Sequence, residues 1–422
     1  MVKPGYKQSE VGIIPEDWGV TTLRAAFPKL EAGVSVNSDN MTSSQFHVLK
    51  TSAVHNGIFD PAEIKPVIKA DYSRLKCPLV QGSIIISRMN TPTLVGECGY
   101  VKNAPADVYL PDRLWQIQNP KDSAYNFEWL NYLLNTKQYR DAVRATATGT
   151  SNSMKNISKE RLMEVEIPWL SLDEQNRISV ALSDIDALIA NLEKLITTKK
   201  AIKQGTMQEL LSGSHRLEGF NTPWKSYRVG NIGIFYSGLT GKSKADFGTG
   251  SARYITFMNV LANSIIDIRK LESVRVLDGE SQNAVEKYDL FFNTSSETPE
   301  EVGMCAVLTE DLEDTYLNSF CFGFRVTEPE MHPLFLSYYF NSQEGRKIMG
   351  VLAQGATRYN LSKSFFSDTV ITVPEKCEQI AIATILSDME DEIDQLHTKL
   401  DKCKYIKSGM MSELLTGRIR LL

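Results

Sequence analysis

Few side chains in this sequence suit a metal site or a disulfide framework. Among 422 residues there are only 5 histidines and 6 cysteines. No two cysteines stand at CxxC spacing, and the histidines lie far apart along the chain. Metal-binding domains and small disulfide-stapled domains usually show such close spacings. We therefore expect no metal site, and cysteines that are reduced and mostly buried.

Long apolar runs are also missing. No stretch approaches the roughly 18 consecutive apolar residues of a membrane helix, and the N-terminal segment MVKPGYKQSEVG lacks the apolar core of a signal peptide. We therefore expect a protein that has no membrane partner and stays in the cytoplasm. Hydrophobic residues make up 42% of the sequence, enough for sizeable cores, and the length predicts roughly two to four domains.

An excess of positive charge is missing as well. The net charge is −5, which argues against a protein that coats nucleic acid indiscriminately, because neutralising phosphates requires a basic excess. The acids are concentrated in two stretches: residues 171–215 hold six acids and five bases, and residues 376–416 hold eight acids and five bases. The remainder is nearly neutral, so local basic surfaces are compatible with the composition.

Signatures of catalysis and nucleotide binding are absent too. The stretch SGLTGKS ends in Gly-Lys-Ser, but Tyr236 stands where a phosphate-binding loop needs its first glycine, so we interpret this stretch as a tight turn after a strand. Asn119-Pro120 runs into Lys121, which breaks the Asn-Pro-Pro-aromatic motif of amino-methyltransferases. Serine, histidine and aspartate are too scattered to suggest a triad. We expect no catalytic residue in this chain.

What the sequence does contain is a long internal repeat. The stretch Asp173–Leu217 returns as Cys377–Leu421 at a constant offset of 204 and without a gap. Shorter matches precede each copy, including IPEDWGVTTL with NTPWKSYRVG and DVYLPD with DTYLNS. A period this long indicates a duplicated domain and not a solenoid. It divides the chain into a globular domain (1–170), a central long helix (171–215), a second globular domain (216–375) and a distal long helix (376–422).

Each globular domain is expected to have an α+β fold. Short runs such as LVQGSIIIS and YDLFFNTS, rich in Val, Ile and Phe and bounded by Gly, Pro or Asn, predict strands. One amphipathic helix should follow them, at Phe127 to Arg144 in the first domain and at Leu334 to Val351 in the second. We predict two similar domains, each with a mixed or antiparallel sheet.

The two repeated stretches carry apolar residues at alternating steps of three and four. This is a heptad seam, which makes a narrow stripe suited to one partner helix. A single such helix would more often cover a sheet, but two matched copies favour pairing with each other. About 38 residues make a rod of roughly 57 Å, and Gly213 and Gly417 are expected to end the rods. The predicted seam consists of Leu182, Ile185, Ile189, Leu192, Ile196, Leu386, Met389, Ile393, Leu396 and Leu400.

Polar loops occupy the same place in the two halves, after equivalent predicted strands. Such a loop is usually only solvated, but its recurrence favours a binding surface. Arginine and asparagine can bond base edges bidentately, while serine, threonine and lysine suit phosphates. In the second loop Glu297, Glu300 and Glu301 reduce the basic character, which favours a loop turned away from phosphate. The DNA-binding candidates are Arg88, Asn90, Thr91, Ser151, Asn152, Lys155, Asn293, Thr294, Arg358, Tyr359 and Asn360.

The chain resembles the specificity subunits of type I restriction-modification systems along essentially its whole length. The resemblance is carried by PEDW near the start, by the helix motif EQ…I…LSD that begins at Glu174-Gln175 and again at Glu378-Gln379, and by the endings MQELLSG…RL and MSELLTGRIRL. It implies two target-recognition domains that alternate with two helices, and an antiparallel coiled coil between those helices.

The resemblance also implies partners. Each recognition domain would read one half of a bipartite, gapped site in double-stranded DNA, with the helices as spacer and as docking surface for modification subunits, two of them in our prediction. A restriction subunit would join the complex. S-adenosylmethionine, ATP and Mg would be bound by these partner subunits, with no cofactor on this chain.

Two alternatives stay open at the level of sequence. A coiled-coil scaffold without nucleic acid would explain the long helices and their acidity. An enzyme with a catalytic centre between the repeats is the other alternative, although no motif points to one.

Overall fold

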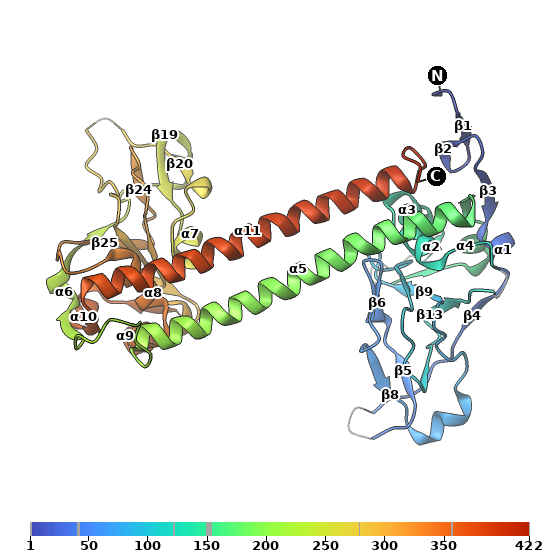
Figure 1. Ribbon diagram of the computed structural model, residues 1–422, viewed down its shortest axis with the longest axis horizontal. Coiled ribbons are helices and arrows are strands. Elements are labelled where there is room, and N and C mark those ends of the chain that lie inside the picture. Colours follow the sequence, from blue (N-terminus) through green and yellow to red (C-terminus); the bar gives the residue numbers. More distant parts are fainter. Residues whose placement is uncertain are drawn as a thin grey trace. The chain divides into compact units, whose positions relative to one another are not determined.

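A computed structural model describes residues 2–39, 43–120, 123–148, 154–277, 279–355 and 358–421. The chain forms two compact units: unit 1 is Met1–Leu192 with Lys399–Leu422, and unit 2 is Glu193–Thr398. Each contains a globular domain and part of two long helices, α5 (Leu172–Ser212) and α11 (Lys376–Leu414) (Figure 1). The boundary between the units therefore runs through both helices, whereas the sequence divides the chain at their ends.

The central sheet of unit 1 has four antiparallel strands in the order β11–β9–β13–β4. These are β11 (Cys98–Tyr100), β9 (Ile84–Ser87), β13 (Leu114–Ile117) and β4 (Leu30–Ala32). Every residue of β9 and β13 is buried. A strand buried on both faces requires a nearly continuous apolar run, which the three isoleucines of β9 supply.

Unit 1 also contains smaller sheets. A mixed sheet has the order β12–β5–β8, in which β12 and β5 are parallel, and another sheet has the order β10–β15–β14. Among the described residues of this unit there are also the strand pairs β1–β2, β16–β3 and β6–β7. Their bounds are β12 (Val108–Tyr109), β5 (His47–Leu49), β8 (Ile64–Pro66), β10 (Met89–Asn90), β15 (Lys155–Ile157), β14 (Ala147–Thr148), β1 (Tyr6–Ser9), β2 (Gly12–Pro15), β16 (Glu166–Trp169), β3 (Gly19–Thr22), β6 (Val54–His55) and β7 (Ile58–Phe59).

Unit 2 repeats this plan. Its central antiparallel sheet has the order β18–β25–β21–β23, the mixed sheet is β20–β19–β24 with β19 parallel to β24, and the small sheet is β22–β27–β26, with one further pair, β17–β28. The bounds are β18 (Gly233–Ser237), β25 (Cys321–Val326), β21 (Leu290–Asn293), β23 (Cys305–Val307), β20 (Glu272–Val274), β19 (Phe247–Ile255), β24 (Thr315–Leu317), β22 (Ser295–Ser296), β27 (Tyr359–Leu361), β26 (Ala353–Gln354), β17 (Lys225–Arg228) and β28 (Val370–Val373). The predicted α+β class with mixed and antiparallel sheets is confirmed in both domains.

The prediction of one amphipathic helix in each domain is wrong in one respect, because the structure has two helices there. In unit 1 these are α2 (Phe127–Leu134) and α3 (Lys137–Ala145), and in unit 2 they are α8 (Pro333–Asn341) and α9 (Gln343–Leu352). A hydroxyl turns back onto the chain at each break: Thr136 Oγ1 donates to Leu133 O at 2.9 Å, and Ser342 Oγ to Tyr339 O at 2.6 Å. Such side-chain bonds compete with the helical ladder. The shorter helices are α1 (Leu23–Ala26), α4 (Lys159–Met163), α6 (Val229–Ile232), α7 (Phe257–Ala262) and α10 (Lys363–Asp368).

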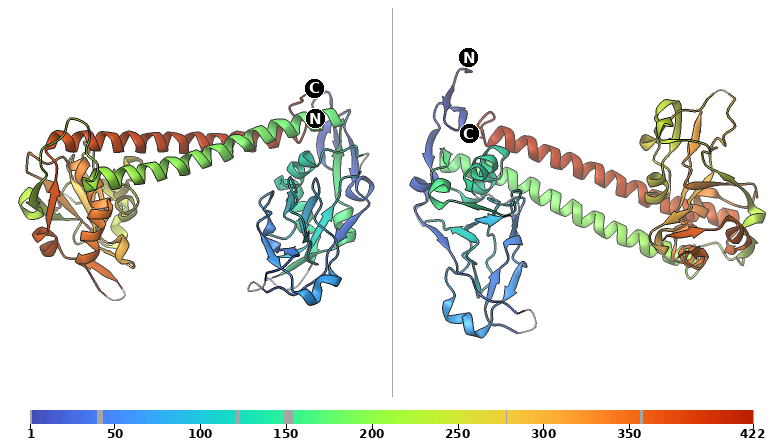
Figure 2. Two further views of the ribbon diagram at one scale, coloured as in Figure 1. Left: turned by 60° about the horizontal axis from the view of Figure 1, so that its bottom comes forward. Right: turned by 180° about the vertical axis from the view of Figure 1, so that it is seen from behind.

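The long helices run antiparallel within each unit. In unit 2, Lys199 Nζ lies 2.7 Å from Glu392 and Lys203 Nζ lies 3.1 Å from Glu390, so residue numbers fall along α11 as they rise along α5. In unit 1, Lys407 Nζ lies 2.7 Å from Asp186. Figures 1 and 2 show the corresponding stretches side by side in each unit. The antiparallel pairing of the two helices is therefore present in both units.

The predicted seam residues all lie on the covered face of these helices. Leu182 and Leu386 also join the cores of the globular domains of units 1 and 2, respectively. Those cores take in the opposite helix ends as well, Leu414 in unit 1 and Leu211 in unit 2. The buried members are Leu182, Leu192, Ile196, Leu386, Ile393 and Leu400, and the half-buried ones are Ile185, Ile189, Met389 and Leu396.

Gly213 directly follows α5, as the sequence predicts, whereas α11 ends at Leu414 and Gly417 lies in the turn after it. Both adopt positive φ, +73° and +70°, the left-handed conformation that favours glycine at a helix end. Each also packs against a tryptophan: a Cβ at Gly213 would lie 3.2 Å from the Trp224 ring, and one at Gly417 3.1 Å from the Trp18 ring. Each domain is thereby tied to the end of a long helix.

Candidate nucleic-acid interface

The polar loops singled out in the sequence are brought together as a small sheet in each unit. In unit 1, strand β10 pairs with β15, which sets Asn90 opposite Lys155. In unit 2, strand β22 pairs with β27, which sets Ser296 opposite Tyr359. Residues more than sixty positions apart in the sequence therefore share one surface in each domain.

One backbone position links three segments at this surface in both units. Arg88 N donates to Arg113 O at 2.9 Å, and Arg88 O accepts from Ile157 N at 3.0 Å. The equivalent bonds in unit 2 join Thr294 N to Phe320 O at 2.9 Å and Leu361 N to Thr294 O at 2.9 Å. We call Arg113, Arg88 and Ile157 the unit 1 triplet, and Phe320, Thr294 and Leu361 the unit 2 triplet. The two domains thus present the same frame with different side chains.

The side chain of Arg88 is held in place at this surface. Its Nε donates to Asn156 Oδ1 at 3.2 Å, its Nη1 donates to Asp112 O at 3.4 Å, and the guanidinium lies 5.5 Å from the centre of the Trp115 ring. Arg88 is half-buried. A guanidinium fixed by its inner donors keeps the orientation of its outer edge, which suits planar, bidentate recognition.

The other DNA-binding candidates of unit 1 differ in their exposure and in the contacts that their side chains already make. The Asn90 amide shapes the loop, since Nδ2 donates to Ser87 Oγ at 3.2 Å and Oδ1 accepts from Thr91 N at 2.9 Å. Thr91 is exposed and Lys155 is half-buried on β15. Ser151 and Asn152 lie outside the described residues.

Asn293 in unit 2 does not face a ligand. It is fully buried, its Nδ2 donates to Glu301 O at 2.8 Å and its Oδ1 accepts from Met304 N at 2.7 Å. Because both ends of the amide bind backbone, the side chain holds the loop closed. This corrects the expectation that Asn293 offers hydrogen bonds to DNA.

The remaining unit 2 candidates lie around the triplet. Thr294 Oγ1 donates to Phe320 O at 2.7 Å, which leaves its methyl group and not its hydroxyl proton for a partner. Arg358 and Asn360 are exposed and Tyr359 is half-buried. Asn360 Nδ2 donates to Arg358 O at 3.3 Å, which fixes the turn into β27.

Sequence reasoning missed three residues of this surface, namely Asn156, Arg113 and Phe320. Asn156 directly follows the candidate Lys155 in the sequence. The matched segments DVYLPD and DTYLNS end one residue short of Arg113 and Phe320. The next position of that match aligns Arg113 with Phe320, but nothing in the two segments places either residue at this surface.

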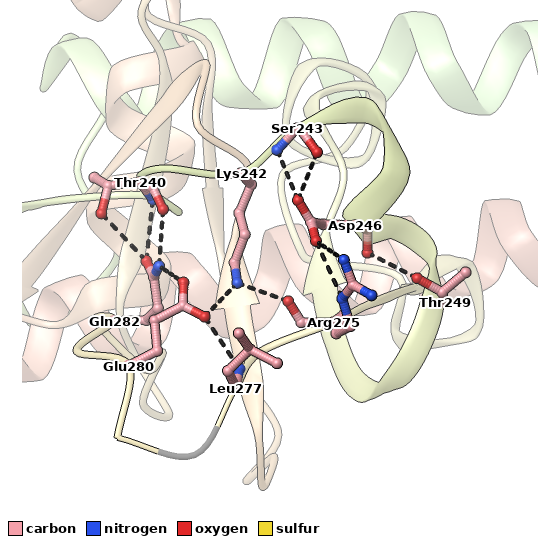
Figure 3. Close-up of polar contacts among 9 residues, drawn as sticks. All are labelled: Thr240, Lys242, Ser243, Asp246, Thr249, Arg275, Leu277, Glu280 and Gln282. Atoms are coloured by element: carbon pink, nitrogen blue, oxygen red, sulfur yellow. Dashed lines mark hydrogen bonds and ion pairs between the residues drawn. The ribbon is translucent and has the colours of Figure 1, made fainter.

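The Gly-Lys-Ser loop of unit 2 is built from its own contacts (Figure 3). Lys242 Nζ donates to Arg275 O at 2.7 Å and to Glu280 Oε2 at 2.5 Å, and its side chain is only 5% exposed. Ser243 N and Oγ both donate to Asp246 Oδ2, at 2.9 and 2.7 Å. The Lys242 ammonium lowers the pKa of Glu280 to about 2. Lys242 therefore stabilises the loop and does not point at a phosphate.

Metal ligands and membrane spans were also sought in the described ranges. Within them no group of three or more histidine, cysteine, aspartate or glutamate residues could hold a metal ion. No helix in the same ranges is both long and apolar enough to cross a membrane.

Comparison with known proteins gives the family. A model described as the type I restriction modification DNA specificity domain matches residues 15–204 and again residues 221–404. A Methanocaldococcus jannaschii protein, provisionally named the specificity subunit of type I restriction enzyme MjaX, is 22% identical over 99% of this chain and 97% of its own length. The type I restriction enzyme MjaVIII specificity subunit of the same organism is 27% identical over 51% of this chain and 50% of its own length.

Solved structures share the fold. The S subunit of a type I restriction-modification system from M. genitalium matches with a TM-score of 0.57 at 17% identity, covering 94% of this chain and 96% of that one. A chain from a structure concerned with complex assembly and conformational transition of the type I R-M system gives 0.55 at 13% identity, covering 96% and 99%. Because one domain model accounts for both halves of the sequence, this chain belongs to the family of type I restriction-modification DNA specificity subunits.

Proposed function

We propose that this chain reads a bipartite, gapped site in double-stranded DNA, with the domain of each unit recognising one half. The observation that carries the proposal is the pair of triplets. In both domains the same backbone hydrogen bonds join three segments of the chain. The side chains on these segments differ, because Arg113 and Arg88 of unit 1 correspond to Phe320 and Thr294 of unit 2. A shared frame with different side chains is suited to two half-sites of different sequence.

The side chains fit base recognition in the major groove. Arginine bonds guanine O6 and N7, asparagine bonds adenine, and threonine or phenylalanine contacts the thymine methyl group. Unit 1 offers Arg88 with Asn156, and unit 2 offers Thr294 with Asn360. The two half-sites should therefore differ, and the target need not be palindromic.

The long helices serve as spacer and as docking surface for modification subunits in this proposal. On the unit 2 part of α5, Leu195 and Ile202 are seven residues apart and 41% and 48% exposed. Apolar side chains repeated on an open helix face favour a helical partner. We propose two modification subunits and one restriction subunit as partners. S-adenosylmethionine, ATP and Mg would bind to those subunits, and this chain would be the non-catalytic member of the complex.

Methylome sequencing of a host that expresses the chain with its modification subunits tests the function. The expected result is methylation confined to one gapped motif, and loss of that methylation when this chain is deleted. Methylation of the same motif without the chain would overturn the proposal.

A gel shift with the same subunits separates DNA reading from a scaffold role. DNA recognition predicts a complex with motif DNA that weakens steeply with salt, because phosphate contacts release counterions. If the chain is a scaffold that does not touch nucleic acid, the subunits should assemble on it, but DNA binding should be the same with and without this chain.

A further inference from the structure

We infer that Arg113 and Phe320 are equivalent specificity-determining residues, the first for a guanine in the half-site of unit 1 and the second for a thymine in the half-site of unit 2. This inference rests on the proposed function. It names one base contact in each domain, made by the residue whose carbonyl oxygen accepts the central N–H of the triplet. Neither residue stands out in the sequence, because one is an ordinary surface arginine and the other an apolar residue in a polar turn.

The two residues occupy the same place in the fold. Arg113 follows β12 and directly precedes β13, and Phe320 follows β24 and directly precedes β25. Strand β12 is parallel to β5, as β24 is parallel to β19. Each residue also accepts, through its carbonyl oxygen, the backbone N–H at the centre of its triplet, Arg88 or Thr294.

The turn that carries each residue is rigidly supported. Phe320 N donates to Asn318 Oδ1 at 2.9 Å, and Phe320 O accepts from both Thr294 N and Thr294 Oγ1. A glycine from a neighbouring segment lies against the turn in each unit. A Cβ at Gly33 would lie 1.6 Å from Leu110 O. One at Gly238 would lie 2.2 Å from Asn318 O, so only glycine lets the two backbones approach this closely.

The side chains project outward from these fixed backbones. Phe320 is 57% exposed, whereas Phe322 and Phe324, two and four residues further on, are fully buried. A single exposed apolar residue is ordinary by itself. Phe320 differs because three hydrogen bonds hold its backbone while more than half of the residue stays exposed, which is the arrangement expected of a preorganised contact.

Arg113 has the corresponding freedom in unit 1. Its side chain is exposed and makes no ion pair within the described residues of the chain. The carbonyl of Asp112, the preceding residue, accepts from Arg88 Nη1, so the backbone next to Arg113 is fixed to the Arg88 side chain. An exposed guanidinium at this position has the donors to bond guanine O6 and N7.

Base analogues in the modification complex test the inference without relying on folding of a variant. Thymines in the unit 2 half-site are replaced one at a time by uracil, which lacks only the methyl group, and guanines in the unit 1 half-site by 7-deazaguanine, which lacks the N7 acceptor. We expect methylation by the unaltered complex to fall roughly fourfold at one thymine and roughly tenfold at one guanine. Equal rates at every position would overturn the inference.

Variants then assign each effect to its residue. In a complex with Phe320→Ala, methylation should no longer change when the sensitive thymine is replaced by uracil, but it should still fall with 7-deazaguanine. In a complex with Arg113→Ala, methylation should no longer change with 7-deazaguanine, but it should still fall with uracil. The matched controls are Phe365→Ala, a phenylalanine of unit 2 that is 50% exposed, and Arg161→Ala, an exposed arginine of unit 1. They should respond to both analogues like the unaltered chain.

The outcomes separate this inference from the proposed function. If the unaltered complex methylates a gapped motif but Phe320→Ala and Arg113→Ala respond to both analogues as it does, only the inference is refuted. If the unaltered complex shows no motif at all, the proposed function fails with it.

Discussion

Arg420 donates from Nη2 to Glu174 Oε2 at 2.8 Å, joining the last residues of the chain to the start of α5. The same arrangement recurs in unit 2 between the residues related by the offset of 204: Arg216 Nη2 donates to Glu378 Oε2 at 2.6 Å, at the start of α11. In unit 2 the chain continues from Arg216 into the next domain. In unit 1, Tyr6 of β1 donates its hydroxyl to Gly417 O at 3.0 Å, in the turn that follows α11.

Replacing Arg420 by alanine should destabilise unit 1. The carboxylate of Glu174 is almost fully buried and would keep only Trp18 Nε1 as a described side-chain donor. Removing one member of a buried ion pair leaves an uncompensated charge, and the loss should be about 2–4 kcal/mol in the free energy of unfolding. Urea unfolding measures it, and Arg216→Ala should give a similar loss in unit 2.

Arg418→Ala is the matched control for this prediction. Arg418 pairs with Glu413 on the surface, and such pairs contribute less than about 1 kcal/mol. A loss for Arg418→Ala as large as for Arg420→Ala would contradict the assignment of stability to the buried pair.

Unit 2 should lose stability in acid through Glu280. The Lys242 ammonium lowers the pKa of this carboxyl from its ordinary value of 4.5 to about 2. Because the folded-state pKa is the lower one, the carboxylate stabilises the fold above about pH 4.5, and this contribution is lost as the pH falls toward 2. Glu280→Gln should flatten the dependence of the unfolding midpoint on pH between 4.5 and 2, whereas Glu310→Gln, at an exposed position, should leave it unchanged.

The long helices and the duplication could be predicted from the sequence because their signals are local or repeated. The heptad spacing of residues such as Ile393 is visible over a few turns, and the offset of 204 aligns whole segments. The break between α2 and α3 could not be predicted from periodicity, since the apolar stripe continues across Thr136 while its hydroxyl ends the helix.

The candidate surface was only partly predictable. Arg88 and Thr294 were found because each follows a buried strand. Arg113 and Phe320 reach the same surface through parallel strand pairing, a long-range arrangement that no local pattern reveals. Asn293 has the polarity of a surface residue, yet its amide is consumed by backbone groups that only the folded loop brings near.

Ile393→Asp should disrupt the seam of the long helices in unit 2. Ile393 is 6% exposed, whereas Ile380, on the same helix and in the same unit, is 42% exposed. Burying an unpaired carboxylate is costly, so we expect a loss of about 3 kcal/mol or more for Ile393→Asp, and less than about 1 kcal/mol for Ile380→Asp. Thermal unfolding followed by circular dichroism measures both, and equal losses would argue against a seam at this position.

Leu195→Glu combined with Ile202→Glu should weaken binding of the modification subunits without altering the stability of the free chain. Both side chains are exposed on α5, so the change should cost little stability in the isolated protein. In the complex it places charge in an apolar contact. We expect affinity to fall at least about tenfold, measured by titration calorimetry. Lys200→Glu, also exposed on α5, is the control for added negative charge, and a comparable fall there would point to electrostatics instead of an apolar docking surface.

Exchanging residues 14–168 for the corresponding segment of a relative should change one half of the recognised motif and leave the other half as it was. The domain of unit 1 has its own core and its own triplet, centred on Arg88, and these belong to the same compact unit. The exchanged segment ends before α5, so Glu174 and Arg420 keep their pair and the long helices keep their sequence. Methylome sequencing of the exchanged protein with its modification subunits reads both halves at once. A change in both halves would mean that the two domains do not read independently, and it would remove the reason for assigning Arg113 and Phe320 to separate half-sites.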